Sequence, residues 1–516
     1  MMRAMKKRFH DEGPSRRAAL RRLGLAAGGI ALSGYAVGCE DDTETAPGES
    51  GGDAGAMDAG AEADTGQGPD AAPEVDAGES APDLQPVRGD GSHPFDYIDT
   101  LIIVQMENRS FDHMFGSLSL LEGRDDVDGL REGMSNDAPD GTPVPIHPLT
   151  GRYVIDPDPP HGHGPSVNAF NDGANDGFVR SQMASHPDAD DTERADVMGY
   201  YTRADLPVSY ALADAYTLCQ NWHCGALAPT WPNRFFSHCA TSEGHLRNNE
   251  SVGAPTPYTA LVEAGGTWAS YFNNLYFTLL IEQHRRDLGR KADEFFSDAA
   301  AGTLPNVSIV EPAFFVNDDH PPSDVRMGQA FLATVYEAVR RSPQWSRCLM
   351  LVFYDEHGGF FDHVPPPLAQ GETRPDEGFA HVGFRVPGLV IGPLAKRGHV
   401  LDAMVEHSSV PALVSRVFGL PFVNERSEMA GDLGQALTLD HVRGADRPTA
   451  PALETAEVPM SALEHALRAD NGQPELMEWM RRMGLAHHDS LPERRRVLRR
   501  VLEEGKALGA IKFSRG

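Results

Sequence analysis

The chain has 516 residues, of which 40% are hydrophobic, and its formal net charge is −30. This length suits one large domain or two to three ordinary ones, with enough apolar residues for a substantial core. The acidity argues against nonspecific nucleic-acid binding, because such binding takes most of its affinity from Lys and Arg that neutralise phosphates. We therefore expect no nucleic-acid partner, and an anionic ligand would need a local positive feature such as a metal ion.

Residues 1–38 have the pattern of an export signal. They contain eight Lys or Arg and two Asp or Glu, and an "SRR" tripeptide at Ser15 precedes a weakly apolar segment over 23–37. That segment is too short to remain as a membrane span, and the paired arginines resemble a twin-arginine signal. "AVGC" ends at Cys39 and resembles a lipoprotein processing site. The sequence predicts an exported protein, periplasmic, at the cell surface or secreted, with a lipid anchor at Cys39; an ordinary cleaved signal is the alternative.

Residues 39–92 are predicted to form a disordered acidic linker. Between 39 and 87 the chain has fourteen Asp or Glu and no Lys or Arg. With almost no large apolar residues, such a segment cannot bury a core. We expect it to tether a folded domain over residues 93–516, whose last part, from about residue 455, reads as a helical tail.

The remaining cysteines do not have the spacing of a zinc site. Because export permits disulfides, we expect one local bridge among the three that fall within a short stretch, with pairing left open. The four cysteines are Cys219, Cys224, Cys239 and Cys348.

From Phe95 onward, short apolar runs alternate with amphipathic segments. Runs bounded by Gly, Pro or Asn suit strands buried on both faces, and Met327–Ser342 has helical spacing. Residues 150–200 are crowded with Gly, Pro, Asn and Asp and read as loop. The alternation predicts an α/β domain with a mainly parallel central sheet flanked by helices. The four runs are "TLIIVQMEN" (Thr100–Asn108), "NVSIVEP" (Asn306–Pro312), "CLMLVFYDEHGG" (Cys348–Gly359) and "VPGLVIGP" (Val386–Pro393).

Two of these runs end in clusters of possible metal ligands. Glu107 and Asn108 follow the first run, and Asp355 and Glu356 follow the third. In open parallel sheets, ligands bind beyond the carboxyl ends of the strands, which is where these side chains should lie. Oxygen-only ligation favours Ca, Mg or Mn, with Zn as the less favoured alternative. Taken alone, each pair could equally be a strand-end cap.

The stretch "APTWPNRFF" places a hydroxyl near a helix start. We expect a helix to begin near Pro232, with Thr230 at or just before its N-terminus. That position favours an anion and an ionised hydroxyl, and a metal ion could make the hydroxyl a usable nucleophile. Plain helix capping is the commoner role for a Thr in such a turn.

Nine short motifs together resemble a known family. The pattern is similar to bacterial phosphoesterases that include metal-dependent phospholipases C and a related acid phosphatase, within the alkaline-phosphatase-like superfamily. In family order the motifs are "ENRSFDHMFG" (Glu107–Gly116), "DPPH" (Asp158–His161), "APTWPNRFF" (Ala228–Phe236), "GGTWASYF" (Gly265–Phe272), "LPNVSIVEP" (Leu304–Pro312), "DHPPSD" (Asp319–Asp324), "YDEHGGFFDHVPPP" (Tyr354–Pro367), "GFRVPGLVIGP" (Gly383–Pro393) and "EHSSVPALVSRVFGL" (Glu406–Leu420).

The resemblance implies an alkaline-phosphatase-like fold and a role for each matching residue. Thr230 matches the nucleophile, and His161 and His320 match histidines placed around the phosphate. The residues implied as ligands of one or more divalent metal ions are Glu107, Asn108, Asp355 and Glu356. Three further histidines have no assigned role: His284, His357 and His363. Gly358 and Gly359 are expected to turn the chain away so that a substrate can approach.

The implied activity is metal-dependent hydrolysis of phosphoric esters through a phospho-threonine intermediate. The substrate would be a phosphate ester such as a phospholipid head group, and the enzyme phospholipase C-like or acid phosphatase-like. One alternative is a catalytically inactive surface lipoprotein that keeps the fold for binding, against which the complete ligand set argues. A sulfatase-like relative is a second alternative, but it would need Cys or Ser where Thr230 stands.

Overall fold

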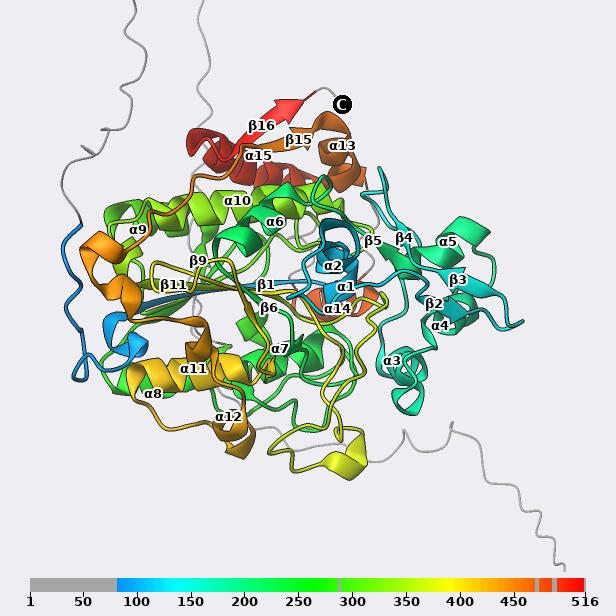
Figure 1. Ribbon diagram of the computed structural model, residues 1–516, viewed down its shortest axis with the longest axis horizontal. Helices are drawn as coiled ribbons and strands as arrows, with labels where there is room; N and C mark the ends of the chain where they lie inside the picture. Colours follow the sequence, from blue (N-terminus) through cyan, green and yellow to red (C-terminus); the bar gives the residue numbers. More distant parts are fainter. Residues whose placement is uncertain (1–80, 286–288, 469–472, 485–489, 515–516) are drawn as a thin grey trace, which may run out of the picture. The chain divides into compact units, whose positions relative to one another are not determined.

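The computed structural model describes most of the chain (Figure 1). The described residues are 81–285, 289–468, 473–484 and 490–514. The predicted export signal, Cys39 and residues 39–80 of the predicted linker lie outside these ranges. Residues 81–92, which the sequence analysis placed in the linker, pack onto the domain: Leu84 is buried, and its amide donates to the Val442 carbonyl at 2.9 Å. The linker boundary predicted at residue 92 is therefore too late.

The described residues are built on an eight-stranded sheet with strand order β13-β6-β12-β11-β1-β10-β8-β9. All neighbours are parallel except at β12, which runs antiparallel to both β11 and β6. The prediction of a mainly parallel sheet is confirmed, with "VPGLVIGP" supplying the reversed strand. In chain order the strands are β1 (Thr100–Met106), β6 (Thr217–Cys219), β8 (Trp268–Phe272), β9 (Arg290–Lys291), β10 (Val307–Val310), β11 (Cys348–Tyr354), β12 (Gly388–Ile391) and β13 (His399–Leu401).

The central strands are continuous apolar runs because helices cover both faces of the sheet. Every residue of β1 and β11 is buried, as expected for parallel strands between two helical layers. In Figure 1, α6, α9 and α10 lie on one side of the sheet and α7, α8 and α11 on the other. These helices are α6 (Pro207–Ala215), α7 (Thr230–Cys239), α8 (Pro257–Glu263), α9 (Ala292–Ala301), α10 (Val325–Arg340) and α11 (Ser409–Phe418).

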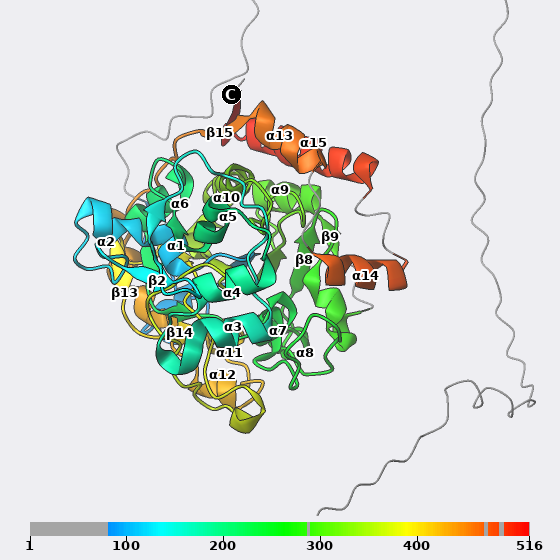
Figure 2. The ribbon, with the colours of Figure 1, turned by 90° about the vertical axis from the view of Figure 1, so that its right-hand side faces the viewer.

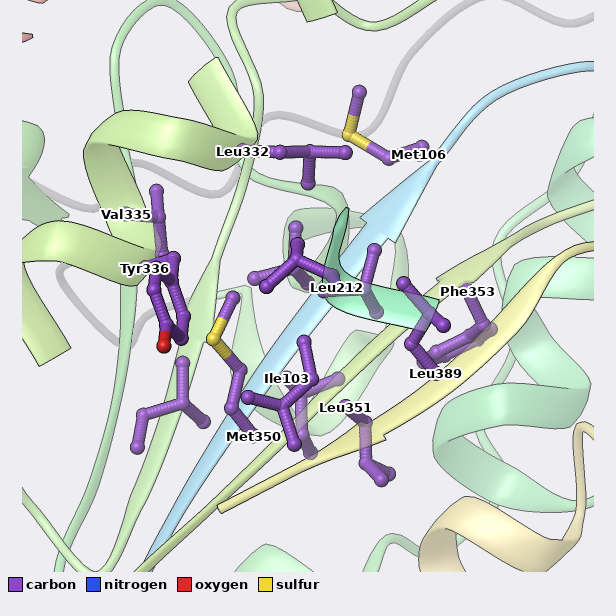
Figure 3. Packing of buried hydrophobic residues seen from close by; sticks show 14 of the residues in the cluster. Ile103, Met106, Leu212, Leu332, Val335, Tyr336, Met350, Leu351, Phe353 and Leu389 are labelled. Carbon is purple, nitrogen blue, oxygen red and sulfur yellow. The ribbon is translucent and has the colours of Figure 1, made fainter. Parts of the chain in front are cut away.

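The helix α10 forms much of the core on its side of the sheet. The Asp324 side chain caps its N-terminus by accepting from the Arg326 amide at 3.0 Å. Figure 3 shows side chains of this helix, including Leu332 and Val335, packed over Ile103 and Met350 of the central strands. Burying such side chains contributes roughly 1.5–3 kcal/mol each to the stability of the fold. This packing holds the central strands, whose carboxyl ends carry the predicted metal ligands.

The segment over residues 150–200 is more regular than its composition indicates. The prediction of a loop is wrong there, because α3 (His163–Phe170), α4 (Phe178–Ser185) and α5 (Asp191–Ala195) form. Asp190 and Glu193 make a capping box for α5. Phe170 and Phe178 belong to a separate apolar cluster, so tertiary packing supplies the stability that the helix propensities lack.

The C-terminal segment adds both helices and strands. The sequence analysis expected only helices from about residue 455, whereas β15 and β16 form a two-stranded parallel sheet. None of the helices in the described residues has the length and apolar content to cross a bilayer. The bounds are β15 (Ala456–Pro459), α13 (Met460–Arg468), α14 (Pro474–Arg482), α15 (Leu491–Ala507) and β16 (Ile511–Ser514).

Short elements complete the described residues. They connect the main layers and carry several loops near the carboxyl edge of the sheet. Their bounds are α1 (Phe111–Phe115), α2 (Ser117–Glu122), β2 (Ser135–Asp137), β3 (Pro143–Pro145), β4 (His147–Pro148), β5 (Gly199–Tyr200), β7 (Trp222–His223), β14 (Val405–Glu406) and α12 (Glu425–Met429).

The expected local disulfide does not form among the described residues. All four cysteines, Cys219, Cys224, Cys239 and Cys348, are buried free thiols. They sit in different parts of the fold: Cys219 ends β6, Cys239 ends α7 and Cys348 begins β11. Burial raises the pKa of the Cys224 thiol well above its usual value, so it packs as a small apolar group.

Candidate active site

Three adjacent strands each end in a buried carboxylate. Glu107 follows β1, Glu311 follows β10 and Asp355 follows β11, and all three side chains are at most 2% exposed. The register pairs Met106 with Tyr354, so Glu107 and Asp355 reach the same level of the sheet edge. Glu107 and Asp355 were predicted from the sequence, whereas Glu311 was not, although its run "NVSIVEP" also ends in a glutamate.

The fully buried Arg234 joins these carboxylates. Its Nε donates to Asp355 Oδ2 at 3.2 Å, and its Nη1 donates to Glu311 Oε2 at 3.2 Å. Its Nη2 lies 3.2 Å from Glu107 Oε1. One guanidinium thus faces three carboxylates. Arg234 was not predicted as a site residue. It follows Thr230 by four residues, which places both on one face of a helix, and this spacing could have identified it.

Thr230 is the first residue of α7, two residues earlier than the expected helix start. Pro229 takes the N-cap position, and the Asn248 side chain caps the first turn, because its Oδ1 accepts from the Trp231 amide at 2.8 Å. Thr230 is 6% exposed. The alternative in which Thr230 serves as the capping residue is therefore not what the structure shows. Because Arg234 of the same helix contacts Asp355, the first turn of α7 lies at the carboxyl edge of the sheet.

His161, His320 and Asn108 come together. The side-chain Nδ2 of Asn108 lies 3.3 Å from His161 Nε2. The imidazole rings of His161 and His320 are perpendicular, with centroids 5.4 Å apart. His161 Nδ1 contacts the Pro159 carbonyl at 2.7 Å, and His320 Nδ1 contacts the Pro321 carbonyl at 2.6 Å. Since carbonyls only accept, each Nδ1 carries the proton and each Nε2 is left for other partners.

Asn108 adopts a left-handed backbone conformation with φ 58°. Its backbone amide donates to Asp355 Oδ1 at 3.0 Å, and this hydrogen bond connects the ends of β1 and β11. A Cβ on Gly358 would lie 2.1 Å from the Asn108 carbonyl oxygen, and one on Gly359 would lie 2.9 Å from the Pro160 carbonyl oxygen. Both glycines turn the chain with positive φ values of 63° and 76°, as expected, and neighbouring chain fills the space that a Cβ would need. That this turn lets a substrate approach stays a prediction.

Glu356 is held by its neighbours in the same loop. Its Oε2 accepts from the Gly358 amide at 2.9 Å and lies 3.0 Å from His357 Nδ1. The His357 ring packs on Phe384 with centroids 4.4 Å apart. Burial lowers the pKa of His357 to about 3, so the ring is neutral at ordinary pH.

The electrostatics of the sheet edge disfavour ionised carboxylates. Burial raises the pKa of Glu107 well above its usual value, and the charges of Asp355 and Asp318 add to this against the opposing effect of Arg234. Burial likewise raises the pKa of Asp355, and that of Glu356 to about 8. A positive charge bound here would relieve the cost of burying these groups.

The residues fit a divalent cation. Three buried oxygens, Glu107 Oε1, Asn108 Oδ1 and Glu356 Oε1, have no hydrogen-bond donor, although the ion pair with Arg234 partly compensates the first. Leaving a buried acceptor unsatisfied costs roughly 1–3 kcal/mol, which a hard metal ion would offset. Asp355 differs, because Asn108, Glu356 and Arg234 already donate to its two oxygens.

A second metal-capable group adjoins this one. Possible ligand atoms of Asp158, His161 and His320 lie within 4.8 Å of one another, and Asp158 Oδ1 is buried without a hydrogen-bond partner. Burial raises the pKa of Asp158 well above its usual value, and the charge of Glu356 adds to this. The sequence analysis assigned both histidines to the phosphate and did not single out Asp158, which belongs to the same "DPPH" motif.

His363 lies in a different cluster, which we call the paired cluster (Asp112, Asp362, His363 and Arg385). Arg385 donates through Nε to Asp362 Oδ1 at 2.9 Å and through Nη2 to Asp112 Oδ1 at 3.1 Å. His363 Nδ1 donates to Asp112 Oδ2 at 2.7 Å. Each of these side chains is thereby compensated, so His363 supports the fold next to the site.

His284 contacts a third set of residues. Its Nε2 lies 2.7 Å from the Thr256 hydroxyl, and its ring packs edge-on against Trp268 with centroids 4.8 Å apart. These contacts give His284 a packing partner and a hydrogen bond in the loop before β9. They do not include any of the residues predicted to bind metal or phosphate.

A model of the phosphoesterase family matches residues 98–421. The chain belongs to this family. Non-specific phospholipase C1 of Arabidopsis thaliana is 34% identical, and the match covers 65% of this chain and 70% of that protein. Phospholipase C B of Mycobacterium tuberculosis is 29% identical over 69% of this chain and 80% of its own length. The prediction of a phosphoesterase is thus confirmed.

The matches to solved structures are more distant. A protein in the alkaline phosphatase superfamily from Vibrio parahaemolyticus aligns over 48% of this chain and 67% of its own, with a TM-score of 0.31 and 13% identity. Murine ectonucleotide pyrophosphatase / phosphodiesterase 5 aligns over 45% of this chain and 95% of its own, with a TM-score of 0.34 and 9% identity.

Proposed function

We propose that this phosphoesterase is a metal-dependent phospholipase C, which hydrolyses the phosphodiester of a phospholipid head group through a phospho-threonine intermediate. The observation that carries the proposal is the set of buried oxygens without a hydrogen-bond donor on Glu107, Asn108 and Glu356, at the sheet edge where α7 begins with Thr230. The relatives named as phospholipases C, from a plant and a bacterium, support the substrate class.

Glu107, Asn108, Asp355 and Glu356 would hold the cation, and their oxygen atoms favour Ca, Mg or Mn over Zn. When bound, such an ion supplies positive charge that favours the ionised Thr230 hydroxyl and the charged phosphoryl oxygens. Arg234 donates hydrogen bonds to Asp355 and Glu311, and its positive charge offsets the repulsion between these carboxylates.

Thr230 is the nucleophile in this proposal. Its place at the start of the ten-residue α7 puts the hydroxyl in the positive field of the helix N-terminus. The Oγ1 atom bonds to phosphorus as the bond from phosphorus to the diacylglycerol oxygen breaks in line. The first step therefore leaves the head-group phosphate on Thr230 and releases diacylglycerol.

His161 and His320 handle the protons and the phosphoryl oxygens. Their Nδ1 protons are committed to backbone carbonyls, so Nε2 faces the reacting group. In the first step the unprotonated Nε2 of one imidazole takes the proton of the Thr230 hydroxyl and gives it to the leaving diacylglycerol oxygen. In the second step the same nitrogen takes a proton from the water that hydrolyses the phospho-threonine and returns it to Thr230 Oγ1. A general acid or base of this kind contributes about 10²–10⁴-fold.

A substrate panel with metal add-back tests the proposal. The full chain is stripped with a chelator and supplied with Ca²⁺, Mg²⁺, Mn²⁺ or Zn²⁺, each alone. Phosphocholine release from phosphatidylcholine vesicles is compared with hydrolysis of an aryl monophosphate. We expect metal-dependent release from the vesicles and a loss of about 10³-fold or more in Thr230→Ala, with Thr230→Ser retaining part of the rate.

Two outcomes would contradict the proposal. Near-normal turnover of Thr230→Ala would remove the nucleophile assignment. A preference for the monophosphate would favour an acid phosphatase, the other activity that the family resemblance implies. Thr241→Ala is a matched control, because Thr241 is a partly buried threonine that lies just after the same helix α7.

We further propose that the protein is exported and anchored through a lipid on Cys39. The support is the basic and weakly apolar leader that ends in "AVGC", followed by the acidic stretch that would separate the anchor from the domain. Labelling of cells with a radioactive fatty acid should mark the wild-type protein and not Cys39→Ser. Equal labelling of both would contradict the anchor.

A further inference from the structure

A residue from the C-terminal segment reaches the candidate metal ligands. Gln473 Nε2 donates to Glu107 Oε2 at 2.8 Å and lies 3.4 Å from Asp318 Oδ2, across sequence separations of 366 and 155 residues. Gln473 is only 7% exposed. Its side-chain amide thus lies between the buried carboxylates of Glu107 and Asp318, and Glu107 directly follows the central strand β1.

Gln473 is also the residue from which α14 begins, and its side chain makes no capping bond to that helix. Leu476, Trp479 and Met480 of α14 are buried in an apolar cluster with Trp231 and other residues. The rings of Trp479 and Trp231 meet edge to face, with centroids 6.2 Å apart. Figure 1 and Figure 2 show α14 set apart from α13 and α15.

The apolar cluster and the charged residues share a boundary. Trp231 directly follows Thr230 in the sequence, and the Arg234 guanidinium lies over the ring of Phe314, 5.2 Å from its centroid. Phe314 belongs to the same cluster as Trp479. Seating of α14 on this cluster therefore places Gln473 next to Glu107.

The two oxygens of Glu107 have different surroundings. Oε2 accepts the hydrogen bond from Gln473, whereas Oε1 has no hydrogen-bond donor and lies 3.2 Å from Arg234 Nη2. A neutral amide can fix the orientation of a carboxylate without adding a charge that would repel a cation. Outer residues of this kind typically change metal affinity or activity by about 10- to 100-fold.

We propose that Gln473 is a positioning residue for Glu107. We also propose that it couples metal affinity to the packing of α14 on the apolar cluster that contains Trp231, which we call the seated position of α14. The inference rests on the proposed function, because it takes Glu107 as a metal ligand. Coupling between two binding equilibria is reciprocal. A metal ion that binds more tightly when α14 is seated must therefore also stabilise the seated position of α14.

Metal titrations of the full chain test the first half of the proposal. Metal-free wild type, Gln473→Ala and Trp479→Ala are each titrated by calorimetry with Ca²⁺, Mg²⁺ and Mn²⁺ separately. We expect Gln473→Ala to bind about 10- to 100-fold more weakly. Trp479→Ala should also bind more weakly, because it loosens α14 without removing the amide.

Gln329→Ala is the matched control. Gln329 is a buried glutamine of α10 whose Oε1 accepts from the Val208 amide at 3.1 Å and the Ser209 amide at 3.0 Å. Losing these bonds should lower the melting temperature and leave metal affinity unchanged. A comparable fall in metal affinity in this control would overturn the specific role of Gln473.

Hydrogen exchange tests the reciprocal half without using activity. Addition of the metal should slow amide exchange in residues 474–484 of the wild type, and the slowing should disappear in Gln473→Ala. Unchanged metal affinity and unchanged exchange in Gln473→Ala would overturn this proposal alone. A wild type that binds no divalent metal would overturn the proposed function, and this proposal with it.

Discussion

Two buried charged clusters arise from the same two stretches of sequence and each contains one arginine, yet they differ in how completely their side-chain oxygens accept hydrogen bonds. "ENRSFDH" supplies Glu107 to the candidate active site and Asp112 to the paired cluster. "YDEHGGFFDH" supplies Asp355 to the first and Asp362 to the second. In the paired cluster Arg385 donates to both aspartates, and no polar side-chain atom of its members is left buried without a partner. In the active site three ligand-type oxygens are left without donors.

The difference shows why ligand type alone does not identify a metal site. Asp112, Asp362 and His363 also lie close enough together to hold an ion. Arg385 already pairs with both aspartates. Burial raises the pKa of Asp112, but Arg385 and His363 outweigh it and the net shift is downward, whereas burial outweighs Arg385 at Asp362 and raises its pKa to about 6. The paired cluster is therefore structural. Where acceptors remain without donors, the fold has retained capacity for a ligand.

The largest effect should come from breaking the paired cluster. Arg385→Met leaves Asp112 and Asp362 buried without their cation, and removing one partner of a buried ion pair typically costs about 3–5 kcal/mol. Denaturant unfolding of the metal-free protein measures this loss. Metal affinity of the folded variant should stay at the wild-type value; a large fall would mean that the two clusters are not independent.

The next effect should separate the clusters by metal affinity. Glu107→Gln should weaken divalent metal binding and kcat/KM by at least about 100-fold, because it removes a direct ligand and not an outer partner. Asp362→Asn serves as the matched control from the paired cluster and should change metal affinity little. Calorimetric titration compares them, and equal losses in both variants would contradict the distinction drawn here.

A smaller effect concerns the turn at Gly358, which follows the candidate ligands Asp355 and Glu356. Gly358 and Gly123 have similar positive φ values, 63° and 66°, but only at Gly358 would a Cβ meet neighbouring backbone. Both Gly→Ala changes should carry the left-handed penalty of roughly 1–2 kcal/mol. Gly358→Ala should cost about 1–3 kcal/mol more through overpacking against Asn108. Unfolding free energies of the two variants test this, and equal values would argue against the close approach.

The smallest effect is a pH dependence of stability in the paired cluster. Burial opposes the charge of His363, but the hydrogen bond and charge of Asp112 outweigh it, so the pKa of His363 is raised. A raised folded pKa gives stability that is complete below the unfolded pKa of about 6.5 and is lost as pH rises through the folded value. Urea midpoints over this range should fall for wild type and stay flatter for His363→Gln. An equal fall in the variant would count against the assignment.

Much of the fold could be predicted because its signals are local. The runs that became β1, β10 and β11 are continuous apolar segments, and their carboxyl ends carry the ligand candidates. The helices over 163–195 were missed, because their propensities are weak and packing of Phe170 and Phe178 stabilises them. The reversed direction of β12 was also not predictable, since an apolar run has no sign of strand direction.

The candidate site divides in the same way. Glu107, Asn108, Thr230 and Asp355 were named from motif and position, whereas Glu311 and Arg234 were not. The ion pairs of Arg234 join residues 121 and 77 positions away in the chain. A local pattern carries no information about such partners, because they depend on which strands are neighbours in the sheet.

By itself, the sequence determined the strand ends that carry carboxylates, a threonine at a helix start and membership of the phosphoesterase family. These follow from residue type, from periodicity and from short motifs. Only the tertiary structure decided which arginine pairs with which carboxylates, which buried oxygens have no hydrogen-bond donor, and that Gln473 reaches Glu107. The physical reason is that the state of a buried charge depends on all of its neighbours in space, and here those neighbours come from distant parts of the chain.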